Sequence, residues 1–197
     1  FCCFLKTSAQ IPANFNGEYL LFIDHEKQEP VLILNDSTIY RGYNFKKSKL
    51  KSLVADISFK DLSGIHINNQ TYIVDKGCGP VYRFANNEFI RLDKTFRHRN
   101  QFGASTFVYE NQLYFFGGYG MFTLKNIVTY FDEHLGEWFE YPIYSSKTPT
   151  SRTHAKSLLV NDRLFIWGGS NNDDATAEEG LLDNTVWTLN IKSNSWE

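Results

Sequence analysis

The chain has few cysteines, no long apolar run and little net charge, and each of these absences excludes a class of protein. It has three cysteines in 197 residues, and removal of the first nine residues would leave only Cys78. An intramolecular disulfide framework is therefore not expected. No apolar stretch approaches the ~20 residues that a membrane-spanning helix needs. The formal net charge of −2 gives no general attraction to nucleic acid or to a membrane surface.

Sequence motifs for catalysis and metal binding are also missing. The five histidines are dispersed, and neither a His-Glu-x-x-His motif nor a paired-cysteine zinc spacing occurs. The glycine run that starts at Gly117 lacks the later glycine of a dinucleotide-binding loop, because Thr123 stands at that position. No Gly-x-Ser-x-Gly elbow is present. The sequence accordingly predicts no cofactor, no metal site and no catalytic residues.

Aromatic residues make up 16% of the chain, and many of them belong to an internal repeat. Two double glycines lie 51 positions apart, each at the end of an aromatic and aliphatic run, and a tryptophan follows each of them. The recurring residues are Gly117, Gly118, Trp138, Gly168, Gly169 and Trp196. Glycine permits positive φ and close backbone approach at a strand end, and buried tryptophan removes a large apolar area from water. We therefore expect all six to serve packing rather than ligand binding.

Both copies of the repeat indicate pairs of short strands joined by tight turns. In the second copy, Ser157–Val160 and Leu164–Trp167 flank an Asn161-Asp162 turn. In the first copy, Ser105–Tyr109 is followed by a Glu110-Asn111 turn. Asparagine and aspartate tolerate the left-handed backbone of two-residue hairpin turns. These signals, with no long helical period beside them, predict an all-β chain.

Residues 99–197 resemble two kelch repeats in their double glycines, their tryptophans and the segment Arg152-Thr-His154-Ala, which is similar to the residues that precede the first kelch strand. The earlier copy has Arg99, and it has Phe102-Gly103 where the later one has His154-Ala155. The resemblance implies a kelch-type β-propeller, whose blades are four-stranded antiparallel sheets. We expect an all-β segment of about four such blades, forming an incomplete ring.

Weaker copies of the pattern extend toward the N-terminus. Asn69–Val74 is similar to Asn111–Phe116, and Phe89 occupies the tryptophan position. We expect a propeller region over 10–197, with blades at about 10–55, 56–97, 98–148 and 149–197. The lysine-rich segment 46–51 is interpreted as a solvated linker between blades, with a nucleic-acid patch as the alternative.

Both ends of the chain are expected to be cut. The chain begins with Phe1 and stops at Glu197, within an expected fourth strand. Residues 1–9 form an apolar stretch that ends in small residues, which is typical of the tail of a secretion signal cleaved before Gln10. On this interpretation the protein is exported to the periplasm or the extracellular space. An ordinary N-terminal strand in a cytoplasmic protein is the alternative.

Candidate binding residues follow from the expected topology. In an antiparallel meander, the start of the first strand, the end of the second and the start of the third lie at the same end of the sheet. Loops held by a rigid scaffold often carry binding residues. The candidates at this end are Arg99, Arg152, His154, Asp173, Asp174, Glu178 and Glu179. The acidic loop at 170–183 has two interpretations that stay open here: the plain solubility of a long loop, or a site for a basic partner or calcium. Its spacing does not match an EF-hand calcium loop.

The function expected from these observations is a non-catalytic binding or scaffolding module for a protein or glycan partner, with no nucleic acid bound. Two alternatives remain open. The first is a propeller enzyme on sugars, because some kelch propellers are galactose oxidases or sialic acid epimerases; the tyrosine, histidine and cysteine-linked tyrosine of the oxidases do not map onto this chain. The second is a sensor segment of a larger regulatory protein.

Overall fold

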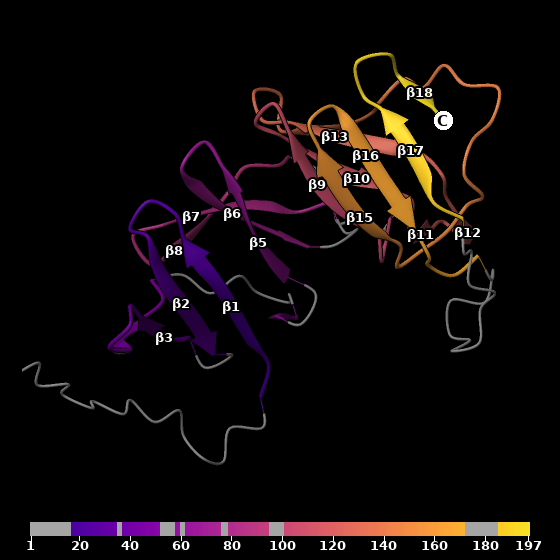
Figure 1. Cartoon of the computed structure of the whole chain (residues 1–197). Helices are drawn as coiled ribbons and strands as arrows, with labels where there is room; N and C mark the ends of the chain where they lie inside the picture. The colour runs from indigo at the N-terminus through magenta and orange to yellow at the C-terminus, as the bar shows by residue number, and fades with distance from the viewer. Residues whose placement is uncertain are drawn as a thin grey trace, which may run out of the picture. The chain divides into compact units, whose positions relative to one another are not determined.

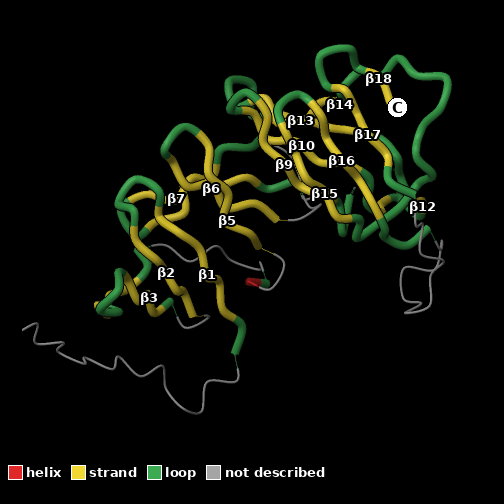
Figure 2. The backbone as a smooth tube through the Cα atoms, in the orientation of Figure 1, coloured by secondary structure: helices red, strands yellow, loops and turns green. Residues whose placement is uncertain are grey.

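The computed structural model describes residues 17–34, 37–51, 58–59, 62–75, 79–94, 101–171 and 185–197. The regular structure of these residues consists of β-strands joined by turns and loops, apart from a short 3₁₀ turn at Phe59 that Figure 2 draws in red, and contains no α-helix (Figures 1 and 2). The chain forms two compact units, Phe1–Val74 with Tyr82–Arg91 and Asp75–Val81 with Leu92–Glu197. The prediction of an all-β chain is confirmed.

Within the described residues, four sheets each contain four antiparallel strands. The β1–β4 sheet is formed by β1 (Tyr19–Asp24), β2 (Glu29–Leu34), β3 (Thr38–Arg41) and β4 (Lys46–Lys49). The β5–β8 sheet is formed by β5 (Leu62–Ile67), β6 (Gln70–Asp75), β7 (Val81–Ala85) and β8 (Glu88–Arg91). In both sheets neighbours along the chain are neighbours in space, so each is a simple meander.

The second unit repeats this arrangement twice. The β9–β14 sheet is formed by β9 (Ser105–Tyr109), β10 (Gln112–Phe116), β13 (Val128–Asp132) and β14 (Glu137–Glu140). A small hairpin of β11 (Tyr119–Gly120) and β12 (Thr123–Leu124) lies between its second and third strands in the sequence. The β15–β18 sheet is formed by β15 (Lys156–Val160), β16 (Arg163–Trp167), β17 (Trp187–Asn190) and β18 (Ser195–Trp196).

Asparagine-containing turns set the register of three hairpins. Both central residues of the turns Asn68-Asn69, Asn86-Asn87 and Glu110-Asn111 have left-handed φ angles between 46° and 63°. Asparagine adopts this conformation more readily than most residues, because its short side chain bonds locally. The hairpins expected at Glu110-Asn111 and Asn161-Asp162 are confirmed by the paired strands on either side of each turn.

The lysine-rich segment differs from the expectation. Lys46–Lys49 is not a linker: it pairs with Thr38–Arg41 as the fourth strand of the first sheet. Its residues are mostly exposed, so the strand carries no hydrophobic pattern that would reveal it. Charged residues, lysine above all, on an edge strand discourage pairing with other chains. The lysines therefore belong to a sheet edge.

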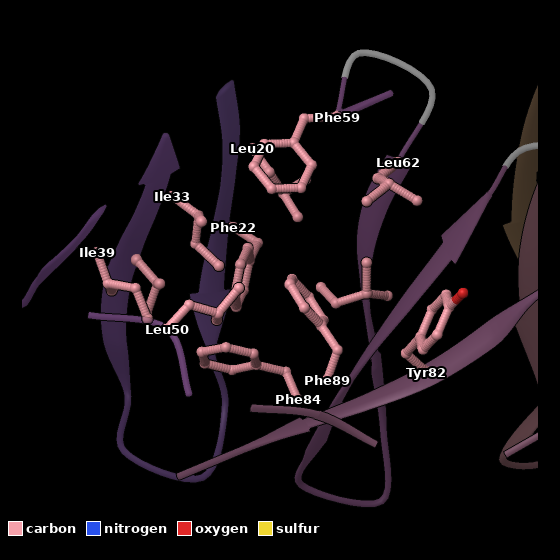
Figure 3. Packing of buried hydrophobic residues seen from close by; sticks show 12 residues of the cluster. Leu20, Phe22, Ile33, Ile39, Leu50, Phe59, Leu62, Tyr82, Phe84 and Phe89 are labelled. Carbon is pink, nitrogen blue, oxygen red and sulfur yellow. The ribbon is translucent and has the colours of Figure 1, made fainter. Parts of the chain in front are cut away.

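The core of the first unit lies between its two sheets. Alternate residues of β1, Leu20 and Phe22, point inward, and Phe22 meets Phe84 edge-on at a ring distance of 4.9 Å (Figure 3). Gly64 of β5 lies so close that an added Cβ would sit 2.4 Å from the Cβ of Phe22. The prediction that Phe89 takes the tryptophan position agrees with its burial and its pairing with Phe84. The close approach at Gly64 brings β1 and β5 into contact.

A mostly buried arginine joins the same two sheets. Arg41 of β3 forms ion pairs with Asp24 and, at 2.7 Å, with Glu29. Its guanidinium also donates to the side-chain oxygen of Asn87 and lies 5.7 Å from the ring centre of Phe84. Removing one partner of such a pair would leave a buried charge without compensation. Arg41 therefore ties the turn after β7 to the first sheet.

Two histidines of the first unit stack on each other. The rings of His25 and His66 lie 3.9 Å apart and 9° from parallel, and the backbone N–H of Asn69 donates to Nε2 of His66. Burial lowers the pKa of His25, the charge of His66 lowers it further, and Asp24 opposes both. The folded chain therefore resists protonation of His25.

Acidification is expected to destabilise the chain through this pair. The pKa of His25 is lower in the folded than in the unfolded state, so protonation favours the unfolded chain. The free energy of unfolding is therefore at its full value above the unfolded pKa of about 6.5 and decreases as the pH falls through the folded pKa. Urea denaturation over this range should show a decline that His25→Gln reduces and that the exposed His134→Gln does not. Equal pH dependence in all three proteins would contradict the assignment.

The core of the second unit lies between the β9–β14 and β15–β18 sheets. Side chains of one sheet, Phe107 and Phe116 among them, pack against Leu164, Ile166 and Trp196 of the other. The ring of Trp196 meets that of Phe116 edge-on at 5.3 Å. The first strands of the two sheets, β9 and β15, are in contact.

The two tryptophans of the repeat occupy equivalent strand positions but different environments. Trp138 pairs with Phe131 as Trp196 pairs with Leu189. Trp196 is buried as expected, whereas Trp138 is only half-buried. Trp138 stacks on Phe115 at 4.5 Å and donates its Nε1–H to the carbonyl oxygen of Gly79 at 2.7 Å. It therefore contributes a hydrogen bond as well as apolar contact.

Candidate functional site

The double glycines form two equivalent corners in the second unit, which we call the double-glycine end. Gly117-Gly118 follows β10 and Gly168-Gly169 follows β16, all with left-handed φ angles between 64° and 96°. A Cβ on Gly118 would lie 2.5 Å from the carbonyl oxygen of Gln101, and one on Gly169 would lie 2.6 Å from that of Thr153. The second glycine of each pair is therefore needed for both its φ angle and its lack of a side chain.

The segment that precedes the first strand of each sheet pairs with the residue that follows the double glycine of the same sheet. Isolated bridges pair Phe102 with Tyr119 and Thr153 with Ser170, so the two corners match at an interval of 51 residues. This register makes Gly103, rather than Phe102, the counterpart of His154. The sequence alignment that placed Phe102-Gly103 opposite His154-Ala155 was therefore wrong by one residue.

Arg152 is completely buried, at 0% exposure. Its guanidinium donates from Nη1 to the carbonyl oxygen of Gly168 at 3.2 Å, and from Nε and Nη2 to the carbonyl and hydroxyl oxygens of Thr150 at 2.9 Å each. Buried arginine is rare unless its donors are satisfied in this way. The side chain proposed as a ligand contact thus braces the corner from inside.

Gln101 performs the equivalent task in the other corner, and the sequence analysis missed it. It is buried, and its Nε2 donates to the carbonyl oxygen of Gly117 at 3.0 Å while its Oε1 accepts from the hydroxyl of Thr129 at 2.6 Å. It precedes Arg152 by the same 51 residues that separate the double glycines. Applying that interval to every residue would have found it.

His154 is exposed beside an aromatic ring. Its backbone is left-handed, with φ of 55°, and its N–H donates to the carbonyl oxygen of Gly103 at 2.7 Å. The imidazole lies edge-on to Phe102 at 6.1 Å, and its Nδ1 is 3.2 Å from the hydroxyl of Thr153. Of the residues that the sequence proposed for binding, His154 is the described one that faces solvent.

The β11–β12 hairpin carries the most exposed apolar residues of this end. Its two-residue tip consists of Met121 and Phe122, which are 73% and 96% exposed. Its base is fixed, because Leu124 is buried and the N–H of Lys125 donates to the carbonyl oxygen of Gly118 at 2.9 Å. The hairpin therefore presents two large apolar side chains from a firm support.

The backbone of this tip is strained. Met121 and Phe122 have φ angles of 52° and 63°, whereas the three other two-residue turns of this kind in the described chain contain asparagine. A left-handed backbone costs ordinary residues ~1–2 kcal/mol each. Strain retained at an exposed position, where asparagine or glycine would relieve it, is a recognised mark of a functional site.

The remaining calls fall outside the described residues. Arg99, Asp173, Asp174, Glu178 and Glu179 lie there, as do residues 1–9 and Cys78. Their proposed roles stay predictions. In the described ranges, no three histidine, cysteine, aspartate or glutamate side chains gather closely enough to hold a metal ion. Across the same ranges, no helix has the length and apolar character needed to cross a membrane.

Comparison with known proteins adds one partial likeness. No family model matches the chain. A segment of it is 29% identical over 89 residues to the Rho GTPase-activating protein gacHH of Dictyostelium discoideum. The match takes in 45% of this chain but only 6% of that protein. The two thus share similarity over a small part of a much longer relative.

Proposed function

We propose that this chain is a segment of a kelch-type β-propeller that binds a protein partner without catalysing a reaction. Four-stranded antiparallel meanders recur along it, and within each unit the first strands of successive sheets are in contact. A propeller is built from four-stranded antiparallel sheets of this kind, and this supports the proposal. The partner binds at the double-glycine end of the second unit, where exposed side chains stand on rigid corners.

The Met121-Phe122 tip is the observation that carries the proposal. Methionine adapts its shape to apolar pockets, and phenylalanine supplies a large area of apolar contact. Because both side chains project from a fixed hairpin, little conformational entropy is lost from the backbone when a partner covers them. Phe102 pairs with Tyr119 at the base of the same hairpin and lies edge-on to His154, so these two residues add an aromatic ring and a polar group to this end. This composition favours a protein with an apolar pocket over a glycan.

The double variant Met121→Asn/Phe122→Gly tests the proposal. It installs the residues that two-residue hairpin turns prefer, so we expect it to raise the free energy of unfolding by about 1 kcal/mol. On an array of folded proteins, we expect the unmodified chain to bind a protein that the double variant no longer binds. Leu135→Asn, at an exposed apolar position in the β13–β14 turn, is the matched control and should bind normally.

Three outcomes of this experiment oppose the proposal. Identical binding profiles for the unmodified chain and the tip variant would place the site elsewhere. Binding to a glycan array, but to no arrayed protein, would replace the protein partner by a sugar. A loss of stability in the tip variant would mean that Met121 and Phe122 serve the fold.

A second candidate is a module within a larger regulatory protein. The partial likeness to a Rho GTPase-activating protein favours it, because there the matched part is 6% of a long chain. In this case the double-glycine end would bind a partner on behalf of another domain. Sequencing the complete transcript tests this candidate: a neighbouring catalytic or signalling domain would support it, and an open reading frame with propeller repeats alone would oppose it.

A further inference from the structure

The outer strand β4 differs from the outer strands of the other three four-stranded sheets. In those sheets the second residue of the fourth strand is aromatic and lies opposite an apolar residue of the third strand: Phe89 in β8, Trp138 in β14 and Trp196 in β18. Lys47 holds this position in β4, opposite Tyr40. A position that breaks the packing pattern of its own repeat is expected to serve a function.

Four lysines on β4 and just after it carry positive charge. Lys46, Lys47, Lys49 and Lys51 are all exposed. In the part of the chain that the structure describes, none of the four forms an ion pair. Arg41, opposite Lys46 on β3, is different, because it pairs with Asp24 and Glu29. The lysines therefore present charge that no described carboxylate pairs with.

The backbone of β4 is open along one side, which we call the β4 edge. β4 pairs with β3 alone. The N–H of Leu50 donates to the carbonyl oxygen of Ser37, on the β3 side. Because these groups alternate along an antiparallel strand, those of Lys47 and Lys49 point away from β3. The fourth strand has a neighbour on one side only in each four-stranded sheet of the described chain, so an open edge is not particular to the first sheet.

We propose that the β4 edge binds an extended acidic segment of a protein partner, which adds to the β1–β4 sheet as a further strand. Open N–H and C=O groups on an edge strand are a template for such an addition, and main-chain hydrogen bonds supply its affinity. The lysines supply specificity, because they repel basic strands and attract carboxylates. The side chains of Lys47 and Lys49 share one face of the sheet, so the matching segment carries acidic residues at alternate positions.

Fluorescence anisotropy of labelled synthetic peptides tests the proposal. The probe is a peptide of alternating glutamate and valine. Its controls are the same peptide with every backbone nitrogen methylated and a peptide of alternating lysine and valine. We expect the unmodified chain to bind the glutamate peptide, less tightly as salt increases, and to bind neither control. Methylation keeps every charge but removes the N–H donors, so it separates strand addition from attraction between charges alone.

Charge-reversed variants of the chain locate the site. Lys47→Glu/Lys49→Glu should weaken binding of the glutamate peptide roughly tenfold or more, and Lys47→Gln/Lys49→Gln should weaken it by a smaller factor. Lys27→Glu/Lys147→Glu makes the same change of net charge at exposed positions outside β4 and should bind like the unmodified chain. All substituted lysines are exposed, so circular dichroism should show unchanged strand content.

Several outcomes would overturn the proposal. These are an unmodified chain that does not bind the glutamate peptide, equal binding of the methylated peptide, and equal binding by both Lys47/Lys49 variants. Tighter binding of single-stranded oligothymidylate, lost in the same variants, would assign the lysines to nucleic acid instead. The tip variant Met121→Asn/Phe122→Gly should bind the glutamate peptide normally, because the β4 edge is a site separate from the one in the proposed function.

Discussion

Gly169→Ala is expected to lower the free energy of unfolding by roughly 2–5 kcal/mol. Gly169 has a φ of +86°, and a Cβ there would meet the carbonyl oxygen of Thr153 at 2.6 Å and the backbone nitrogen of Ala155 at 2.9 Å. The substitution therefore adds a steric overlap with backbone atoms, which cannot move aside cheaply, to the cost of a left-handed alanine. The urea midpoint measures the loss.

Gly168→Ala is the matched control for this prediction. Gly168 precedes Gly169 and is also left-handed, at φ +64°, but a Cβ there would have no atom within 4 Å. Its replacement should cost only the backbone term of ~1–2 kcal/mol. Equal losses at the two positions would show that the close contact of Gly169 with Thr153 and Ala155 contributes nothing to the free energy of unfolding. The comparison thus separates conformation from packing inside one double glycine.

The same contacts connect the fold of the corner to its exposed residues. The backbone of Thr153 lies against Gly169 and pairs with Ser170. The hydroxyl of Thr153 donates to the carbonyl oxygen of Phe102, in the other double-glycine corner, at 3.0 Å. His154 follows directly, so its position depends on that packing. Loss of Gly169 should therefore disturb His154 and its contact with Phe102 before it affects the more distant hairpin tip.

The strands were predictable because their signals are local. Ser105–Tyr109 was predicted and observed with the same bounds, since an apolar segment, an asparagine-containing turn and a second apolar segment specify a hairpin. β4 was not predicted, because Lys46–Lys49 carries no hydrophobic pattern and owes its strand conformation to pairing with β3. Edge strands of this kind are decided by their neighbour in the sheet.

The candidate site was less predictable, because burial is a tertiary property. Arg152 was expected to meet a ligand from its charge and its place before a strand, yet its donors are used by Thr150 and Gly168. The Met121-Phe122 tip was overlooked, because neither residue favours a left-handed turn. The proposed binding site lies at the end of the sheets to which the sequence pointed, and His154 is the described residue of the sequence-based set that is exposed.

Trp196→Ala is expected to lower the free energy of unfolding by about 3–5 kcal/mol. Trp196 is buried between the two sheets of the second unit, edge-on to Phe116 at 5.3 Å and to Trp187 at 6.5 Å. Its removal leaves a cavity in that core, and the cost rises with the cavity volume that the neighbouring side chains fail to fill. Trp138→Ala should cost less, because Trp138 is only partly buried.

Two further measurements make this comparison decisive. Trp138→Phe keeps the stacking on Phe115 but removes the hydrogen bond to Gly79, so it should cost about 1 kcal/mol. Trp196→Phe keeps most of the apolar volume and should cost clearly less than Trp196→Ala. Urea denaturation followed by circular dichroism reports all four variants without relying on tryptophan fluorescence. If Trp138→Ala proved as costly as Trp196→Ala, burial between the sheets would not be what distinguishes the two positions, and the hydrogen bond to Gly79 would be the dominant contribution at Trp138.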